Sequence, residues 1–277
     1  MKTSLYKVVV LLIAAVMLIS ACAPAAPAVE VPAVEAPVAE APVAEAPAAP
    51  AAEAKVFRIA SDATWPPFET IDETTKEMVG FDVDLMKAIA EEAGFEYELV
   101  NVAWDALLAG VSECQYDAAI SSISITEERK ISMNFSEPYA TAGQVVTIGV
   151  DNTEVTGFES LTGKRIGVQL GTTGDFAAQK VEGAEIKSYD TVDLAFQDLM
   201  NKQVDAVIAD LALSADFVLK NPDKIKLVGA QFTDEALGVA VCKNNTELLD
   251  QINKGLAAVQ ASGKLDELKT KWFGGVK

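Results

Sequence analysis

Arg129 and Asp210 are two charged residues whose types and positions suit the recognition of a small charged solute. Arg129 ends the segment 126–129, and its planar guanidinium can bind a carboxylate through two parallel hydrogen bonds, which a lysine cannot reproduce. Asp210 directly follows the apolar segment 204–209 and could hold an ammonium group. Each residue has an ordinary alternative, because Arg129 could be a solvated helix residue and Asp210 could cap a helix that begins at Leu211.

Polar residues near both charges could supply further hydrogen bonds. Ser122 and Ser124 precede Arg129 and offer hydroxyl and backbone partners to the same carboxylate. Residues 171–174, Gly-Thr-Thr-Gly, precede a predicted helix, and the free N–H groups at such a helix start favour an anion near Thr173. This segment could also be only a turn and a cap, and it does not match a phosphate loop because no Gly-Lys-Ser/Thr follows it.

The composition excludes several other kinds of site. The chain has no histidine, which rules out Ser-His and Cys-His nucleophile systems and His-ligated metals. Its formal net charge is −19 and it contains no basic run, so a nucleic-acid backbone would be repelled. We therefore expect no catalytic residue, metal, cofactor or nucleic-acid partner.

Alternating strand and helix patterns must position these residues. Apolar strand-like segments alternate with segments that repeat apolar residues at helical spacing, which predicts an α/β protein with parallel strands covered by helices. The strand-like segments are 57–60, 97–100, 118–120, 165–169, 204–209 and 238–241, and the helical ones are 81–93, 104–111, 173–181, 192–199 and 248–259.

The alternation occurs twice, around a break near residues 139–147, and so predicts two lobes with a cleft between them. Ligands of such sheets bind at the carboxyl ends of the strands. Polar clusters follow several predicted strands at that end: Asp62, residues 121–129, residues 171–173 and Asp210.

The N-terminal segment indicates export and attachment to a membrane. An apolar run over residues 8–19 follows two lysines, as in a secretory signal peptide, and it is short for a membrane span. Residues 19–22, Ile-Ser-Ala-Cys, resemble the lipobox of bacterial lipoproteins, in which the cysteine becomes the lipidated first residue. We predict a signal peptide at 1–21, lipidation of Cys22 and an extracytoplasmic protein held at the membrane by its lipid.

Residues 22–54 are predicted to form a disordered tether. The stretch consists almost entirely of Ala, Pro, Val and Glu, with prolines too frequent for a continuous helix and no aromatic residue to seed a core. The following residues, 55–277, suffice for one large domain or two lobes.

Several short segments of residues 55–277 carry a resemblance to a known family. They are 61–69 (SDATWPPFE), 80–85 (GFDVDL), 104–107 (WDAL), 116–121 (YDAAIS), 124–129 (SITEER), 135–139 (FSEPY), 163–168 (GKRIGV) and 204–207 (VDAV). Together they resemble the family 3 extracellular solute-binding proteins of ABC transporters, which are chiefly amino-acid receptors.

The resemblance implies a two-lobed fold of the type II periplasmic-binding-protein kind. Each lobe is expected to be a mostly parallel sheet flanked by helices, with residues 55–142 and 236–277 in lobe 1 and residues 143–235 in lobe 2. The chain would cross between the lobes near residues 139–144 and 231–237. The function implied is that of a monomeric receptor, not an enzyme, which presents an amino acid to a membrane permease.

The resemblance also implies how the amino acid binds. Its carboxylate would lie on Arg129 and its ammonium on Asp210, while Trp65 and Trp104 would flank its side chain. Asp62 would place a carboxylate in this aromatic slot, which favours a cationic or polar side chain. The full expected set of ligand-binding residues is Asp62, Trp65, Trp104, Ser121, Ser122, Ser124, Arg129, Gln169, Thr172, Thr173 and Asp210.

Arginine or lysine is the expected ligand, with glutamine next. No spare Lys or Arg occupies a matched pocket position, which argues against an acidic ligand, and Gln169 suits a polar side chain. Gln169 and Gly174 depart from the pattern expected for basic amino acids, and Trp65 could be an ordinary core residue.

Cys114 and Cys242 are the cysteines that remain besides Cys22. In an oxidising compartment two cysteines more often form a disulfide than a catalytic device. The resemblance implies that the strands at 118–120 and 238–241 are antiparallel neighbours, which would bring the two cysteines within bridging distance. The alternative is a pair of separate buried thiols.

Other functions compete with that of a receptor. Some relatives of the family are cyclohexadienyl or arogenate dehydratases, in which carboxylates such as Glu69 or Asp62 could act as acids. A glycosidase that uses two carboxylates is a more remote possibility. A sensory ligand-binding module is disfavoured, because neither a second membrane segment nor a kinase-like region follows residues 272–274.

Overall fold

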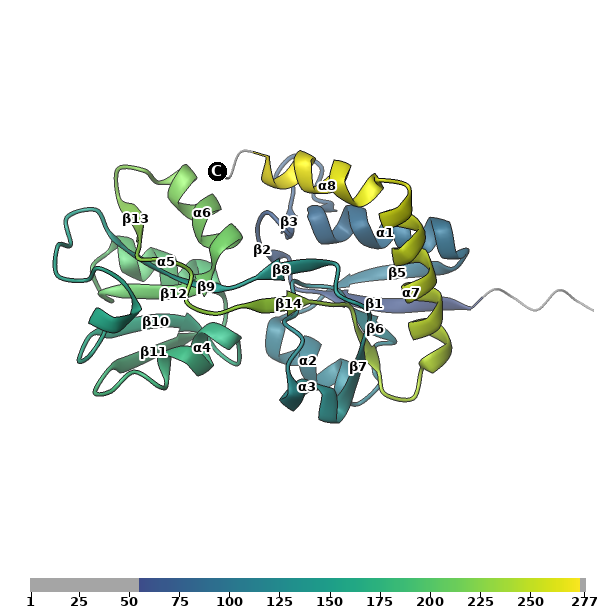
Figure 1. Cartoon of the computed structure of the whole chain (residues 1–277), viewed down its shortest axis with the longest axis horizontal. Coiled ribbons are helices and arrows are strands. Elements are labelled where there is room, and N and C mark those ends of the chain that lie inside the picture. The colour runs from purple at the N-terminus through teal and green to yellow at the C-terminus, as the bar shows by residue number, and fades with distance from the viewer. Residues whose placement is uncertain (1–54, 275–277) are drawn as a thin grey trace, which may run out of the picture. The chain divides into compact units, whose positions relative to one another are not determined.

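The computed structural model describes residues 55–274 (Figure 1). The predicted signal peptide, Cys22 and the tether at 22–54 lie outside these residues. No helix within 55–274 is long and apolar enough to cross a membrane.

Two five-stranded sheets of the same design form the framework of the described part. In each, one strand runs against its neighbours, β15 in the first sheet and β9 in the second, and the others share one direction. This arrangement confirms the prediction of two lobes with mostly parallel sheets. The first sheet has the order β5 (Glu96–Asn101), β1 (Val56–Ser61), β6 (Ala118–Ala119), β15 (Ala240–Cys242), β7 (Met133–Phe135), and the second β11 (Glu185–Tyr189), β10 (Arg165–Gln169), β12 (Ala206–Asp210), β9 (Gln144–Gly149), β13 (Ile225–Val228).

Helices cover both sheets. Figure 1 shows α1 and α8 above the first sheet and α2 and α3 below it. The first lobe contains α1 (Phe81–Ala93), α2 (Trp104–Ser112), α3 (Glu127–Ser132), α7 (Thr246–Ala261) and α8 (Lys264–Phe273), and the second α4 (Thr173–Ala178), α5 (Val192–Met200), α6 (Leu211–Lys220) and the single turn η1 (Phe158–Ser160).

Helix ends follow local backbone chemistry. Gly94 ends α1 as predicted, because its left-handed conformation (φ 75°) lets its N–H bond to the carbonyl of Ala90. The helix predicted over 173–181 ends earlier, at Ala178. Beyond that residue the N–H groups of Lys180 and Val181 bond to carbonyls three residues back, so the chain turns instead of continuing an α-helix.

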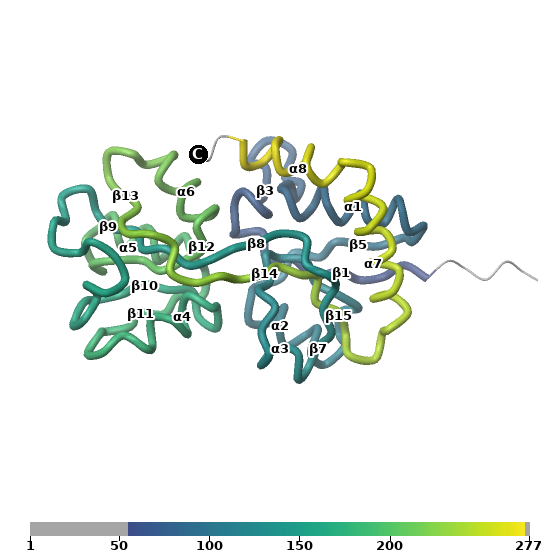
Figure 2. Tube along the Cα trace, in the orientation of Figure 1, coloured from purple at the N-terminus to yellow at the C-terminus, as the bar shows by residue number. Residues whose placement is uncertain are grey.

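Two crossings of the chain connect the sheets. They contain β8 (Ala140–Ala142) and β14 (Glu235–Leu237), which pair antiparallel and run side by side between the sheets (Figures 1 and 2). β9 follows β8, and β15 follows β14, so each crossing leads into the antiparallel strand of the sheet it enters. The lobe boundaries predicted at 142/143 and 235/236 fall in these crossings and stay predictions.

A small three-stranded sheet was not expected from the sequence. It consists of β2 (Thr64–Trp65), β3 (Glu69–Ile71) and β4 (Met78–Val79) and leads directly into α1. Gly80 connects β4 to α1 with φ 148°, and a Cβ atom at this position would lie 2.0 Å from the carbonyl oxygen of Phe68. Only glycine therefore allows β3 and the start of α1 to lie this close.

A disulfide joins Cys114 and Cys242 in the structure. The strands beside it, β6 and β15, pair antiparallel with Ala118 opposite Val241. The N–H of Cys242 also donates to the carbonyl of Asp117 at 2.9 Å, which continues the ladder to the disulfide.

Candidate ligand-binding site

A narrow cavity of about 10 Å³ lies between the two lobes, beside the carboxyl ends of strands from both sheets. Asp210 is the last residue of β12, Ser121 comes shortly after β6, and Thr172 comes shortly after β10. All of the residues expected to bind the ligand line this cavity, except Asp62 and Gln169. The lining residues are Trp65, Trp104, Ser121, Ser122, Ser124, Arg129, Thr172, Thr173 and Asp210.

Arg129 lies in α3 and is buried, with 8% of its surface exposed, so it is not a solvated helix residue. Thr126 caps α3 by accepting the N–H of Arg129 at 3.1 Å. The guanidinium donates to the carbonyls of Ser124 at 2.9 Å and Gly171 at 3.2 Å, and it lies over Trp104 at 5.2 Å from the ring centre. Burial lowers the pKa of Arg129, but a guanidinium remains charged at neutral pH.

Asp210 supplies a buried carboxylate from the second lobe. It occupies the position before α6, yet its side chain makes no capping hydrogen bond, so the simple capping role is not observed. Oδ1 of Asp210 has no hydrogen-bond donor among the described residues. Burial, together with the nearby charge of Glu235, raises the pKa of Asp210 to about 7. The site thus places a guanidinium from one lobe and a carboxylate from the other beside the same cavity.

Glu235 bonds to a residue of the cavity lining but was not predicted from the sequence. It lies on the crossing strand β14, and its carboxylate accepts the hydroxyls of Ser124 at 2.5 Å and Thr233 at 2.7 Å. Gln144, on the other crossing, donates its side-chain amide to Thr173 at 3.1 Å. The sequence did not indicate these residues, because they lie on or beside the crossings and not at the carboxyl ends of parallel strands.

Gln169 connects the lobes next to the cavity. Its carbonyl oxygen accepts the indole N–H of Trp65 at 2.6 Å, and its amide nitrogen donates to Asp62 Oδ2 and to the carbonyl of Asp190, both at 3.1 Å. Gln169 and Asp62 therefore bond to each other and lie outside the cavity lining. Burial raises the pKa of Asp62, and the charge of Asp193 adds to this effect.

Trp65 has two roles in the structure. It lines the cavity, 6.5 Å from Trp104 between ring centres, and it also packs into the apolar cluster of the second lobe with Val192 and Phe196. The core-packing alternative and the cavity-lining expectation therefore both describe this residue.

Ser121 and Ser122 form a cavity wall that is fixed from behind. Ser121 Oγ accepts the N–H of Asp62 at 3.0 Å and donates to Glu69 at 2.9 Å. The N–H of Ser122 donates to Asp82 at 2.6 Å, and Ser122 has a left-handed backbone (φ 43°).

Thr172 and Thr173 form the start of α4 on the other side of the cavity. Thr172 is the N-cap: its hydroxyl accepts the N–H of Asp175 at 3.2 Å and donates to the carbonyl of Gln169 at 2.8 Å. Thr173 is the first residue of the helix. Gly174 follows, and a Cβ atom there would lie 2.8 Å from Gln144 Oε1.

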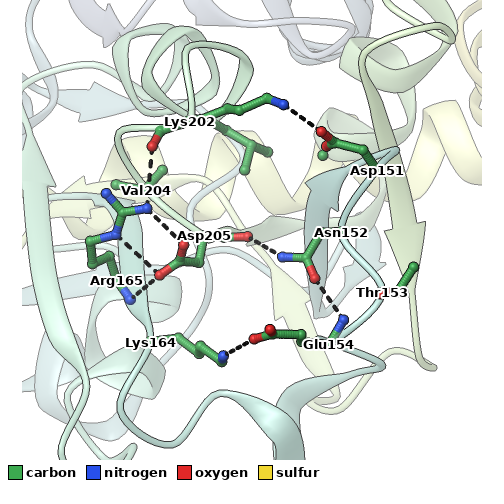
Figure 3. A pocket seen from close by; sticks show the side chains of 11 residues that line it. Asp151, Asn152, Thr153, Glu154, Lys164, Arg165, Lys202, Val204 and Asp205 are labelled. Carbon is green, nitrogen blue, oxygen red and sulfur yellow. Dashed lines mark hydrogen bonds and ion pairs between the residues drawn. The ribbon is translucent and has the colours of Figure 1, made fainter.

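A larger hollow of about 380 Å³ lies on the second lobe but has a different character (Figure 3). Its charged side chains are already paired with one another: Lys164 with Glu154, Arg165 with Asp205, and Lys202 with Asp151. Since these pairs are largely exposed and mutually satisfied, the hollow offers no free charge to a ligand. No group of three or more His, Cys, Asp or Glu side chains within 55–274 is arranged to hold a metal ion.

Comparisons with known proteins agree with this geometry. Residues 57–275 match the family model of the bacterial extracellular solute-binding proteins, family 3. The ABC transporter arginine-binding protein 1 of Escherichia coli (strain K12) is 36% identical over 229 residues, covering 80% of this chain and 93% of that protein. The probable histidine-binding protein of Neisseria gonorrhoeae is 34% identical over 228 residues, covering 80% of this chain and 85% of that protein. The crystallised arginine-, lysine-, histidine-binding protein ArtJ from the thermophilic bacterium Geobacillus stearothermophilus is 40% identical, with a TM-score of 0.75, over 79% of this chain and 96% of that chain.

Proposed function

The chain belongs to the bacterial extracellular solute-binding proteins of family 3, and from this premise we propose that it is the amino-acid receptor of an ABC importer. One observation carries the proposal: Arg129 of the first lobe and Asp210 of the second line the same small cavity. A zwitterion presents a carboxylate and an ammonium group a few ångströms apart, and these two side chains complement its two charges.

The ligand's main-chain groups divide between the lobes. Its carboxylate binds the guanidinium of Arg129, with the hydroxyls of Ser122 and Ser124 on the same wall of the cavity. Its ammonium binds Asp210, whose Oδ1 is buried and has no donor among the described residues. Because each lobe supplies one charge, binding stabilises the arrangement in which both lobes contact the ligand.

A basic side chain suits the remaining charges best. Arg129 is the one cation among the residues that line the cavity, whereas Asp62 and Glu235 lie close by with no cation paired to either in residues 55–274. Trp65 and Trp104 add aromatic faces that attract a cation. The printed names of the similar proteins include binders of arginine, lysine and histidine, which supports the same class of ligand here. Arginine or lysine is proposed first, and glutamine second.

A dehydratase-like enzyme is the weaker alternative. Glu69, one of the two carboxylates considered as an acid, is completely buried and bonded to Ser121, and Asp62 is bonded to Gln169. Neither residue lines the cavity. The similar proteins named above are binding proteins, and we assign the chain no reaction.

The receptor works outside the cytoplasm and delivers its amino acid to a membrane permease. We propose that it is a monomer, that residues 1–21 are removed, and that lipid on Cys22 holds it at the membrane through the segment 22–54. Cys22→Ser should release the protein from the membrane fraction of cells, as detected by immunoblot. A variant that stays membrane-bound without the cysteine contradicts the lipid anchor.

A thermal-shift screen across the twenty common amino acids tests the function. A ligand that binds only the folded protein raises the apparent melting temperature, so L-arginine or L-lysine should give the largest shift. Micromolar binding, about −8 kcal/mol, would make the shift easy to detect at millimolar ligand. If no amino acid raises the melting temperature, the proposal is wrong. If only acidic ones do, the expected ligand class is wrong.

A further inference from the structure

Two carboxyl groups lie buried together behind the cavity wall. Glu69 of β3 and Asp82 of α1 both have no exposed surface. The backbone brings them together, because Asp82 donates its N–H to the carbonyl of Phe68 at 3.0 Å and Gly80 allows this close approach. Their carboxyl groups bond to the adjacent residues Ser121 and Ser122, and each carboxyl group affects the pKa of the other.

One oxygen of each carboxyl group already accepts hydrogen bonds, in each case from a serine of the cavity wall. Glu69 Oε1 accepts the hydroxyl of Ser121 at 2.9 Å. Asp82 Oδ2 accepts the N–H of Ser122 at 2.6 Å and the hydroxyl of Tyr139 at 2.9 Å. The other two oxygens, Glu69 Oε2 and Asp82 Oδ1, are buried and have no donor among the described residues.

No cation compensates this pair. None of the ion pairs in residues 55–274 includes Glu69 or Asp82. The titratable groups that face the pair are Asp62, whose negative charge acts on Glu69, and Tyr139, whose hydroxyl bonds to Asp82. Two ionised carboxylates without a cation would be costly at a site that excludes water.

Starting from the amino-acid-binding function proposed above, we propose that Glu69 and Asp82 hold a single proton between Oε2 and Oδ1 and thereby position Ser121 and Ser122 for the ligand. That proton provides the donor that both oxygens lack. Asp82 lies in the first turn of α1, where the helix favours its negative charge, so the proton belongs mainly to Glu69. Both residues are positioning residues, because they act on the ligand through the two serines.

The pH dependence of the folding stability follows from the direction in which the pKa of Glu69 is shifted. Burial, with the neighbouring carboxyl group second in effect, raises the pKa of Glu69 well above its usual value. A raised pKa means that the folded protein binds more protons than the unfolded one. The stability that the pair contributes is therefore fully present below the pKa of an unfolded glutamate, about 4.3, and is lost as the pH rises through the folded pKa.

Amide variants should replace the shared proton permanently. In Glu69→Gln the amide oxygen can accept from Ser121 while the NH₂ group donates to Asp82. In Asp82→Asn the NH₂ group can donate to Glu69 instead. The matched control is Glu73→Gln, which removes the same charge from an exposed turn between β3 and β4.

The test records melting temperatures without ligand from about pH 5 to about pH 9, followed by L-arginine titrations. We compare the melting temperature of each amide variant with that of the wild type at each pH. The difference, variant minus wild type, should become more positive by about 2–4 °C as the pH rises, because only the wild type loses the shared proton. Glu73→Gln should show no such trend. Wild-type affinity for L-arginine should fall by about 2–10-fold relative to Glu69→Gln over the same range, as expected for a weakened hydrogen bond in the wall.

Each result has one interpretation. If the difference in melting temperature between the amide variants and the wild type does not change with pH, the shared proton is wrong. It is also wrong if neither amide variant folds, because either amide group supplies the donor that the two oxygens lack. A constant affinity ratio overturns the positioning role. If the melting difference follows the prediction but no amino acid binds any of the proteins, the proposed function fails while the shared proton stands.

Discussion

Arg129 and Asp210 respond differently to the burial that they share. Burial lowers the pKa of Arg129, but the guanidinium begins so high that it keeps its charge at neutral pH. Burial and the charge of Glu235 raise the pKa of Asp210 to about 7, so its charge changes in the physiological range. The half of the site proposed to bind the carboxylate is therefore insensitive to pH, whereas the half proposed to bind the ammonium is not.

Replacement of Arg129 should weaken binding more than the loss of an exposed charge. Arg129→Ala leaves the ligand's buried carboxylate without its partner and should cost about 3–5 kcal/mol of binding free energy. Arg129→Lys keeps the charge but loses the planar fork, so it should recover only part of this loss. Calorimetric titration with L-arginine measures both, and Lys130→Ala, an exposed neighbour, is the control. Unchanged affinity in Arg129→Ala would remove this residue from the site.

Binding should depend on pH through Asp210. An ammonium group binds the ionised carboxylate, so affinity should rise as the pH increases toward about 7 and then level off. Asp210→Asn should lose about 10- to 150-fold in affinity at pH 8 and show no such rise. Glu235→Gln removes a charge that raises the pKa of Asp210, so it should move the rise to lower pH. If Asp210→Asn keeps the wild-type pH profile, the ammonium lies elsewhere.

The sequence was informative about some site residues and silent about others, for physical reasons. The sequence predicted that Arg129 and Asp210 lie near each other, because the segment 121–129 and Asp210 each follow an apolar strand and the topology of parallel sheets brings such strand ends together. Glu235 could not be found in this way, because it lies on a crossing strand that meets the site only when the lobes are assembled. The Glu69–Asp82 pair had a visible signal, since each acidic residue directly follows a phenylalanine in an apolar stretch.

At the scale of elements, longer periodic segments were predictable and short ones were not. The helix at 81–93 has a clear apolar repeat and a terminal glycine, and it appears as predicted. Strands β2, β3 and β4 have two or three residues each, too few for any alternation to be visible. Their existence depends on the close contact between Phe68 and Gly80, which only the folded chain shows.

The disulfide should contribute measurably to the first sheet. Cys114 and Cys242 are 128 residues apart, and closing so long a loop restricts the unfolded chain. The double variant Cys114→Ser/Cys242→Ser should lose about 3–5 kcal/mol of unfolding free energy in denaturant titrations. Wild type treated with a reductant should match the double variant, and titration of unfolded, unreduced wild type should find neither thiol reactive. Two reactive thiols would contradict the bridge.

At the scale of the whole binding unit, a few side chains hold the lobes against each other. Trp65 inserts from the first lobe into the apolar cluster of the second, and Gln169 reaches back to Trp65 and Asp62. Hydrogen bonds next to the cavity therefore favour the closed arrangement in addition to the ligand's own charges.

Loss of Gln169 should shift the protein toward a more open form. Gln169→Ala removes the hydrogen bonds to Trp65 and Asp62, so without ligand the radius of gyration from small-angle X-ray scattering should exceed that of the wild type. Gln179→Ala is the control, because Gln179 bonds to Asp175 within the second lobe. Saturating L-arginine should bring the two variants closer together. Equal radii without ligand would contradict a role for Gln169 in closure.

The bond between Cys114 and Cys242 turns part of the chain into a covalent ring. Every strand of the second sheet and both crossings lie between these two residues in the sequence. If a protease cuts once anywhere in that ring, the pieces stay attached and migrate together on a gel until a reductant is added. A receptor cut once in this ring therefore keeps both halves of its cleft on one molecule.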